Sequence, residues 1–257
     1  MSRPSAARAP REWNAEVYDR VSDTQRDWGL EVLERLPLAG QERVLDAGCG
    51  SGRVTRALVE RLPRGHVIAV DASRAMVEKA RATLPSRCEV RVADLSELAL
   101  DAPVDAILST AVFHWVPDHA RLFERLHRAL RPGGRLAAQC GGEGNVASLA
   151  AALRELREEE PFSTSLSGWD GPWNFRAPAA AAADLEAAGF TDVRCWLEDR
   201  PVTPADPRDY LETVTLGLHL ERLPEHLRDR FVDAVVDRMP DPLTLDYVRL
   251  NIDARRD

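Results

Sequence analysis

The stretch VLDAGCGSG at residues 44–52 restricts the fold of this chain more than any other part of its sequence. Its apolar start predicts a short strand that ends near Asp46, and its alternating glycines permit a tight turn and a close approach of the backbone to a ligand. A helical pattern follows at once, with apolar residues at positions 54, 58 and 62. A strand, a glycine-rich turn and a helix in this order predict the first unit of an α/β fold with a ligand site at the turn.

The alternation of strand and helix patterns continues through the first 140 residues. We expect further strands and helices, the last helix stopped by Pro132-Gly133-Gly134, at these ranges: strands at 66–70, 88–92, 104–108 and 135–140, helices at 75–84 and 120–130. This rhythm predicts a doubly wound, mostly parallel sheet with helices on both faces. Ligands of such sheets bind beyond the carboxyl ends of the strands.

The regular alternation ends after Cys140. We expect, in chain order, the following elements: a helix at 145–160, an irregular segment at 161–178, a helix at 179–188, a strand at 191–197, a mostly helical stretch at 207–239 broken at Pro224, and a last strand at 243–255. The domain organisation that follows has four parts: a helical lid at 1–40, a core at 41–204 with an insertion at 143–177, a helical cap at 205–240 and a final core strand at 241–257.

Charge and cysteine content argue against several classes of protein. The formal net charge is −8 and the basic residues form no stripe, which argues against a nucleic-acid partner. No apolar run approaches the roughly 18 residues of a membrane span, and residues 1–11 lack the apolar core of a secretory signal. Four single cysteines, without a CxxC pair, predict neither a metal site nor disulfides: Cys49, Cys88, Cys140 and Cys195. We therefore expect a cytoplasmic monomer or homodimer with no membrane partner and no metal.

A second acidic residue, Asp71, stands at the end of the next strand and can accept hydrogen bonds from both hydroxyls of a ribose. The competing interpretation is a dinucleotide site, whose G-x-G-x-x-G pattern requires a glycine at position 53. Arg53 stands there instead. A pyrophosphate needs bare helix amides, whereas an amino acid that carries a sulfonium suits a carboxylate such as Asp46 near its ammonium. The pattern favours an adenosyl sulfonium over a dinucleotide.

These motifs and their order resemble those of the class I S-adenosylmethionine-dependent methyltransferases, and the resemblance covers nearly the whole chain. Besides the glycine-rich stretch, it includes the acidic residue followed by Ala72, Ser73 and Met76, the loop Ala93-Asp94-Leu95, and the turn LRPGGRL at 130–136. The resemblance implies a Rossmann-like, seven-stranded, mostly parallel sheet with an antiparallel last strand and a helical cap. It also implies S-adenosylmethionine as the cofactor, bound by these residues: Tyr18, Gln25, Asp46, Gly48, Gly50, Asp71, Ala72, Met76, Asp94, Leu95, Ser109 and His114.

Within that class the chain is similar to the trans-aconitate and juvenile-hormone-acid methyltransferases. The similar stretches are 13–25 (WNAEVYDRVSDTQ), 113–116 (FHWV), 187–190 (AAGF) and 247–251 (YVRLN). The resemblance implies that Gln25 and Trp115 hold a substrate carboxylate. Residues 143–176 match no particular substrate class.

The expected activity is methyl transfer to a small molecule, with O-methylation of a carboxylate as the leading reaction. An ionised carboxylate needs no general base, whereas a hydroxyl or carbon nucleophile does, and His114 is the first candidate for one. The alternatives are C-methylation of an alkene or an isoprenoid diphosphate, and a protein that binds S-adenosylmethionine without catalysis. We expect catalytic roles for His114, Trp115 and Gln25, and substrate contacts from these residues: Tyr18, Trp115, Trp173, Arg176 and Tyr247.

Several side chains keep two interpretations. His114 can act in catalysis or only pack at a helix start. Arg176 and Arg249 can bind an anionic substrate through the guanidinium fork, but a surface position is the simpler expectation for each. The simpler expectation for His219 and Glu143 is also a solvated surface. Three tryptophans belong either to the pocket wall or to the core: Trp28, Trp169 and Trp173.

Overall fold

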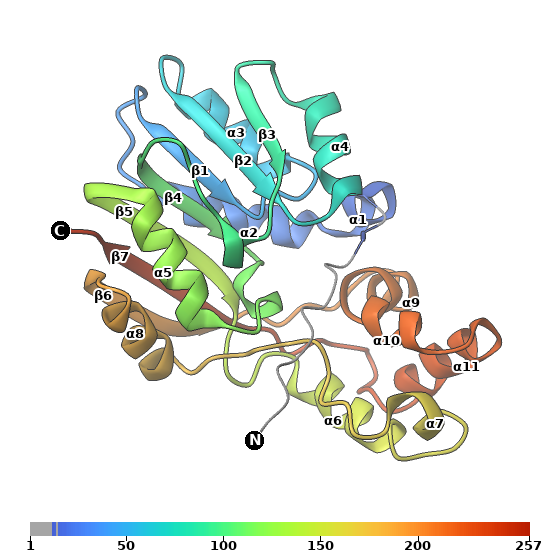
Figure 1. Cartoon of the computed structure of the whole chain (residues 1–257). Helices are drawn as coiled ribbons and strands as arrows, with labels where there is room; N and C mark the ends of the chain where they lie inside the picture. The colour runs from blue at the N-terminus through green and yellow to red at the C-terminus, as the bar shows by residue number, and fades with distance from the viewer. Residues whose placement is uncertain (1–11, 14) are drawn as a thin grey trace.

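A single seven-stranded sheet organises the protein, which we describe from a computed structural model for residues 12–13 and 15–257. Its strands, in the spatial order β3-β2-β1-β4-β5-β7-β6 (Figure 1), are β1 Arg43–Ala47, β2 His66–Asp71, β3 Cys88–Val92, β4 Val104–Thr110, β5 Leu130–Gly141, β6 Thr191–Asp199 and β7 Val248–Arg255. The first five strands pair in parallel, and β7 runs antiparallel to both of its neighbours, β5 and β6. The predicted fold class, a mostly parallel sheet with an antiparallel last strand, is confirmed.

Alternate strand residues build a core on each face of the sheet. Leu45 and Ile68 belong to a buried cluster with residues of α5 (His119–Ala129) and α8 (Pro178–Ala187). Val44 and Val67 belong to the opposite cluster, with residues of α2 (Asp23–Glu34), α3 (Arg53–Arg61) and α4 (Arg74–Thr83). The alternation follows from the period of two along a strand.

The helical lobe beside the sheet has its own core. It contains α6 Ala147–Leu156, α7 Ser163–Leu166, α9 Pro207–Tyr210, the π-helical turn η3 Leu211–Thr215, α10 Gly217–Arg222 and α11 Glu225–Val236. Buried side chains from 143–177 and from 205–240 form one apolar cluster, and Figure 1 shows their helices together on one side of the sheet. The predicted insertion and the predicted cap are therefore one packing unit.

The two N-terminal helices pack against different parts of the protein. α1 (Ala15–Val21) contacts η3 and α4, whereas α2 packs on β4, β5 and α3. Val32, Leu33 and Leu36 are buried in the core layer that α2 shares with α3. The second half of the predicted lid is thus part of the core, and residues 1–11 and 14 lie outside the described residues.

Three predicted boundaries were wrong. β5 already begins at Leu130, because Leu130 pairs with Val104 before a register shift, so the Pro-Gly-Gly turn lies within the strand. The last strand begins at Val248 rather than at residue 243, because the alternating apolar side chains of Leu243, Leu245 and Tyr247 are buried in the lobe. α6 ends at Leu156, and the segment expected to be irregular contains α7. None of the described helices is both long and apolar enough for a membrane span.

Candidate active site

Two carboxylates stand at the carboxyl ends of the neighbouring strands β1 and β2. The glycine-rich turn is tied to β2 by hydrogen bonds from the amides of Gly48 and Cys49 to the Val70 carbonyl, 2.8 and 2.9 Å long. The Asp71 carboxylate accepts hydrogen bonds from the amides of Gly50 and Ser73, both at 2.9 Å. Each of its oxygens is therefore held in place and keeps further lone pairs for a ligand.

Gly48 and Gly50 of this turn differ in the space that a side chain would meet. Both have positive φ, 95° at Gly48 and 53° at Gly50, a conformation that favours glycine. A Cβ on Gly48 would lie 2.1 Å from a methyl carbon of Val112, whereas a Cβ on Gly50 would meet no atom within 4 Å. The open space at Gly50, beside the fixed Asp71 carboxylate, fits an adenosyl ligand that approaches the backbone closely.

Asp46 is a buried acid at the end of β1, only 2% exposed. Burial raises its pKa to about 7, with a further rise from the charge of Asp71, against the lowering effect of the 2.7 Å hydrogen bond from the Thr55 hydroxyl. No ion pair involving Asp46 occurs among the described residues. A carboxyl group in this state gains from a nearby cation, such as the ammonium of an amino acid.

The remaining predicted cofactor residues lie along the same edge of the sheet. Met76 is buried on α4, and Asp94 caps the short helix η1 (Leu95–Glu97) by accepting a hydrogen bond from the Ser96 amide at 2.8 Å. Ser109 is buried on β4, and its hydroxyl donates to the Ala47 carbonyl at 2.6 Å. The hydroxyl of Ser109 thus holds β1 and β4 together.

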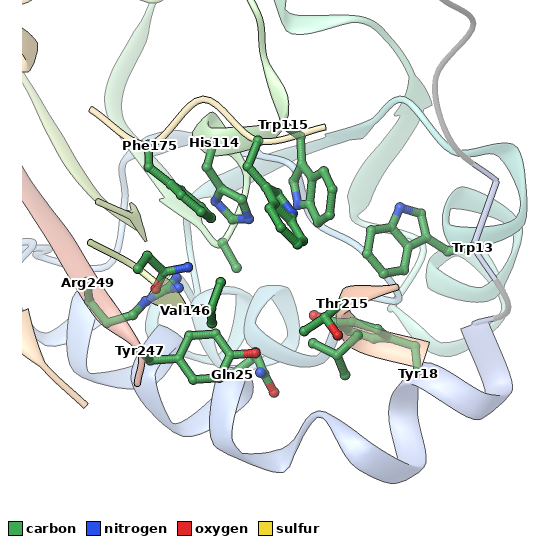
Figure 2. A pocket seen from close by; sticks show the side chains of 14 residues that line it. Trp13, Tyr18, Gln25, His114, Trp115, Val146, Phe175, Thr215, Tyr247 and Arg249 are labelled. Atoms are coloured by element: carbon green, nitrogen blue, oxygen red, sulfur yellow. The ribbon is translucent and has the colours of Figure 1, made fainter. Parts of the chain in front are cut away.

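A cavity of about 50 Å³ lies between the lobe, α1, α2 and the segment that follows β4 (Figure 2). Six of the residues predicted from the sequence line it, together with Arg249: Tyr18, Gln25, His114, Trp115, Trp173 and Tyr247. Trp173 thus lies in the pocket wall, whereas Trp28 is buried in the lobe cluster and Trp169 packs against that cluster. Arg176 does not line the cavity, because its guanidinium forms an ion pair with Asp184 of α8.

His114 lies in η2 (Phe113–Trp115), directly after β4, and points into this cavity (Figure 2). Its Nδ1 accepts a hydrogen bond from the Gly141 amide at 3.2 Å. Burial lowers its pKa well below the usual 6.5, and the nearby charge of Arg249 lowers it further. A neutral ring that accepts at Nδ1 carries its proton on Nε2, so His114 presents a donor to the cavity in this arrangement.

The position of Arg249 differs from the one expected from the sequence. The simpler expectation was a surface position, but the side chain is only 3% exposed on β7 and points into the cavity (Figure 2). Its guanidinium carbon lies 5.0 Å from the ring centroid of Trp28 and 5.8 Å from that of Tyr247. Burial lowers its pKa, and no carboxylate of the described chain forms an ion pair with it. β7, whose start was predicted too early, is buried on both faces at this point: Leu250 belongs to the core cluster with α5 and α8, and the alternation along the strand puts Arg249 on the opposite face.

His219 was also expected on the surface and is instead 5% exposed. Its ring packs between Trp169 and Trp173, with centroid separations of 4.8 and 5.6 Å. The expectation was wrong because the lobe buries one face of α10 against α7 and α11. Glu143, the other residue expected to be solvated, is exposed.

Gln25 of α2 belongs to a hydrogen-bonded group at the floor of the cavity. Its Nε2 donates to the Tyr210 hydroxyl at 2.5 Å, and the hydroxyls of Tyr210 and Tyr247 lie 3.1 Å apart. The Gln25 Oε1 is buried and has no partner within the described chain. In this orientation the amide oxygen of Gln25 is available to a donor from a ligand.

Comparison with known proteins gives a consistent result. A family model described as a methyltransferase domain matches residues 44–134. The trans-aconitate 2-methyltransferase of Azoarcus sp. is 38% identical over 69% of this chain and 65% of that protein, slightly less than two thirds of its length. The enzyme of the same name from Methylobacterium radiotolerans is 34% identical over 87% of both chains.

Solved structures share the fold. A methyltransferase from Mesorhizobium loti, 24% identical, covers 91% of this chain and 99% of its own with a TM-score of 0.56. The phosphoethanolamine N-methyltransferase 2 of Haemonchus contortus, in complex with S-adenosyl-L-methionine, is 19% identical and covers 94% of this chain and 56% of its own with a TM-score of 0.61. The chain therefore belongs to the family of S-adenosylmethionine-dependent methyltransferases that includes the bacterial trans-aconitate 2-methyltransferases.

Proposed function

We propose that this methyltransferase transfers the methyl group to a carboxylate oxygen of a small-molecule acid and so forms a methyl ester. The observation that carries the proposal is Arg249, a buried guanidinium that faces the cavity and has no carboxylate partner within the described chain. An unpaired buried charge is costly, and the carboxylate of a substrate would supply the missing partner through paired hydrogen bonds.

The other lining residues support an anionic acceptor. None of the described residues that line the cavity is Asp or Glu, so the cavity is free of local acidic side chains that would repel a carboxylate. The Nε2–H of His114 and the indole N–H of Trp115 are further donors for the acid's oxygens. The name of the bacterial relatives, trans-aconitate 2-methyltransferase, also identifies a carboxylic acid as their acceptor.

When bound, S-adenosylmethionine supplies the methyl group as an electrophile. We assign the ribose hydroxyls to Asp71, the amino-acid part to the turn at Gly48 and Gly50, and the ammonium to Asp46. The protein's task is then to hold the acid's oxygen in line with the methyl group, about 3 Å away. A carboxylate acceptor is already ionised at neutral pH and needs no base. His114 therefore donates a hydrogen bond to the acceptor and does not remove a proton from it.

C-methylation is less well supported. A carbon nucleophile must lose a proton to a base, and the described cavity wall contains no carboxylate, while His114 already carries its proton on the nitrogen that faces the cavity.

We further propose a cytoplasmic location, because all four cysteines are free thiols, as expected in a reducing compartment.

The test is an assay with S-adenosylmethionine and a panel of carboxylic acids that includes trans-aconitate, with products identified by mass spectrometry. We expect a product heavier by one methylene group that loses its methyl group as methanol in mild alkali, as an ester does. A product that keeps its methyl group in alkali would contradict the proposal, since a carbon- or nitrogen-bound methyl resists this treatment.

A further inference from the structure

A second cavity, of about 270 Å³, lies inside the helical lobe beside the candidate active site. Its walls come from α6, α7, α10 and the segment 169–173, and its apolar lining residues are Ala150, Leu153, Leu166, Trp169 and Trp173. The cofactor residues assigned above do not line it, so methyl transfer by itself gives this cavity no role.

One side chain, Trp173, belongs to the walls of both cavities. On the side of the active site its ring stacks on Phe175 at 5.6 Å and lies 6.3 Å from the ring of Trp115. On the side of the lobe it lies 5.6 Å from the ring of His219, which also lines the second cavity. Trp173 is therefore the side chain that the described walls of the two cavities share.

The volumes of the two spaces together match one ligand pocket of ordinary size. The cavity at Arg249 measures about 50 Å³, far below the roughly 300–1,000 Å³ of ordinary ligand pockets. The cavity beyond Trp173 is about five times larger and brings the combined space to the lower end of that range. The first cavity can thus hold the reacting end of an acid, and the second can hold the remainder.

The charges indicate what kind of remainder fits. The charged groups that line the second cavity are exposed or paired: Arg154 is exposed, and Arg157 donates a 2.9 Å hydrogen bond to the 96% exposed Asp170. Of the described arginines that line either cavity, only Arg249 is buried, and it has no carboxylate partner in the described chain. This arrangement suits one carboxylate and an apolar body, and it matches a tricarboxylate poorly.

We propose that the second cavity is the distal part of the acceptor site and binds the apolar body of a monocarboxylic acid whose carboxylate lies at Arg249. This inference rests on the proposed function and adds the substrate class to it. The body passes along the face of Trp173, and the aromatic and aliphatic walls on the lobe side remove it from water.

The length of the acid is the direct test. We would measure kcat/KM for butyrate, octanoate and trans-aconitate with the wild-type enzyme, following ester formation. Each methylene buried in an apolar cavity contributes about fourfold in binding, from about 0.8 kcal/mol per methylene. We therefore expect octanoate to exceed butyrate by more than about tenfold, and trans-aconitate to be a poorer substrate than octanoate.

Filling the second cavity provides a matched comparison. Ala150→Phe places a ring in this cavity, whereas Ala147→Phe places the same ring on the exposed first turn of the same helix. We expect Ala150→Phe to lower kcat/KM for octanoate about tenfold, the equivalent of roughly two buried methylenes, and to leave butyrate nearly unchanged. We expect Ala147→Phe to change neither value.

Several results would overturn the inference, and they differ from those that overturn the proposed function. If no acid is esterified, the proposed function fails. If acids are esterified but butyrate equals octanoate in the wild-type enzyme, only the inference about the second cavity fails, whether or not the Ala150 variant folds. An equal loss for both acids in a folded Ala150→Phe enzyme would also reject it.

Discussion

Replacing Arg249 by methionine separates the two roles that a buried cation can have. Methionine keeps a long, flexible, mostly apolar side chain and removes only the charge and the hydrogen-bond donors. In the wild-type protein the guanidinium is 3% exposed and lies over two rings, those of Trp28 and Tyr247. The substitution therefore tests whether Arg249 stabilises the fold or binds a ligand.

The expected change in stability is small. Removing the charge loses two cation–π contacts, worth about 0.5–2 kcal/mol each. It also removes the cost of keeping out of water a guanidinium that has no carboxylate partner among the described residues, which is several kcal/mol per ion. Without substrate, we expect the free energy of unfolding to stay within about 1 kcal/mol of the wild-type value or to rise, and 1 kcal/mol corresponds to about 2–4 °C in Tm for a chain of this size.

The expected change in activity is large. Hydrogen bonds to charged groups contribute about 1.5–3 kcal/mol, so kcat/KM for an acid should fall by about 10- to 150-fold. Affinity for S-adenosylhomocysteine should remain within about twofold, because our cofactor assignments place no contact at Arg249. Esterification kinetics, calorimetric titration and thermal unfolding measure these three quantities.

Arg176→Met is the matched control. Arg176 pairs with Asp184 and does not line the cavity, so its replacement leaves a half-buried carboxylate unpaired. We expect this variant to lose more stability than Arg249→Met and to keep its kcat/KM. A large fall in Tm for Arg249→Met together with unchanged kcat/KM would show that the buried guanidinium is structural and does not bind the substrate.

Three further predictions concern the cofactor turn and His114. Because burial keeps His114 neutral, kcat/KM at saturating cofactor should show no inflection from about pH 6 to about pH 8, and an inflection near the usual histidine pKa would instead indicate a base. The carboxyl of Asp46, with a pKa of about 7, is neutral below that pH and charged above it, so calorimetric affinity for S-adenosylhomocysteine should rise with pH through about 7. Asp46→Asn should remove this dependence, and a slope that persists would assign it to another group. Gly48→Ala should lower Tm more than Gly50→Ala because only the first Cβ meets Val112, while Gly50→Ala should mainly weaken cofactor binding. Equal losses of Tm would contradict the difference in packing.

Local patterns in the sequence were sufficient for the parallel strands and for the edge of the sheet to which we assign the cofactor. The strand, turn and helix around Gly48 and Gly50 depend on residues adjacent in the chain, as does the position of Asp71 at the end of the next strand. Because the parallel strands β1 and β2 end at the same edge of the sheet, the glycine turn and Asp71 lie close together independently of the packing of the other segments. The order of these elements was therefore predictable, with errors mainly at boundaries such as Leu130 and Val248.

The proposed acceptor site was predictable only in part. Gln25, His114, Trp115 and Tyr247 were expected from the resemblance, and the structure brings them to one cavity. That resemblance did not extend to residues 143–176, which supply part of the lobe and, apart from His219, every residue that lines the second cavity.

The α/β rhythm, the glycine turn and its two carboxylates could be predicted from local sequence, because each follows from periodicity or backbone freedom within a short stretch. The pairing of two arginines became clear only from the folded chain: Arg176 pairs with Asp184, whereas Arg249 at the cavity has no carboxylate partner among the described residues. The two arginines are chemically alike, and what separates them is the distance to a carboxylate contributed by another element. Burial and charge pairing depend on contacts between segments far apart in the chain, which no local pattern records.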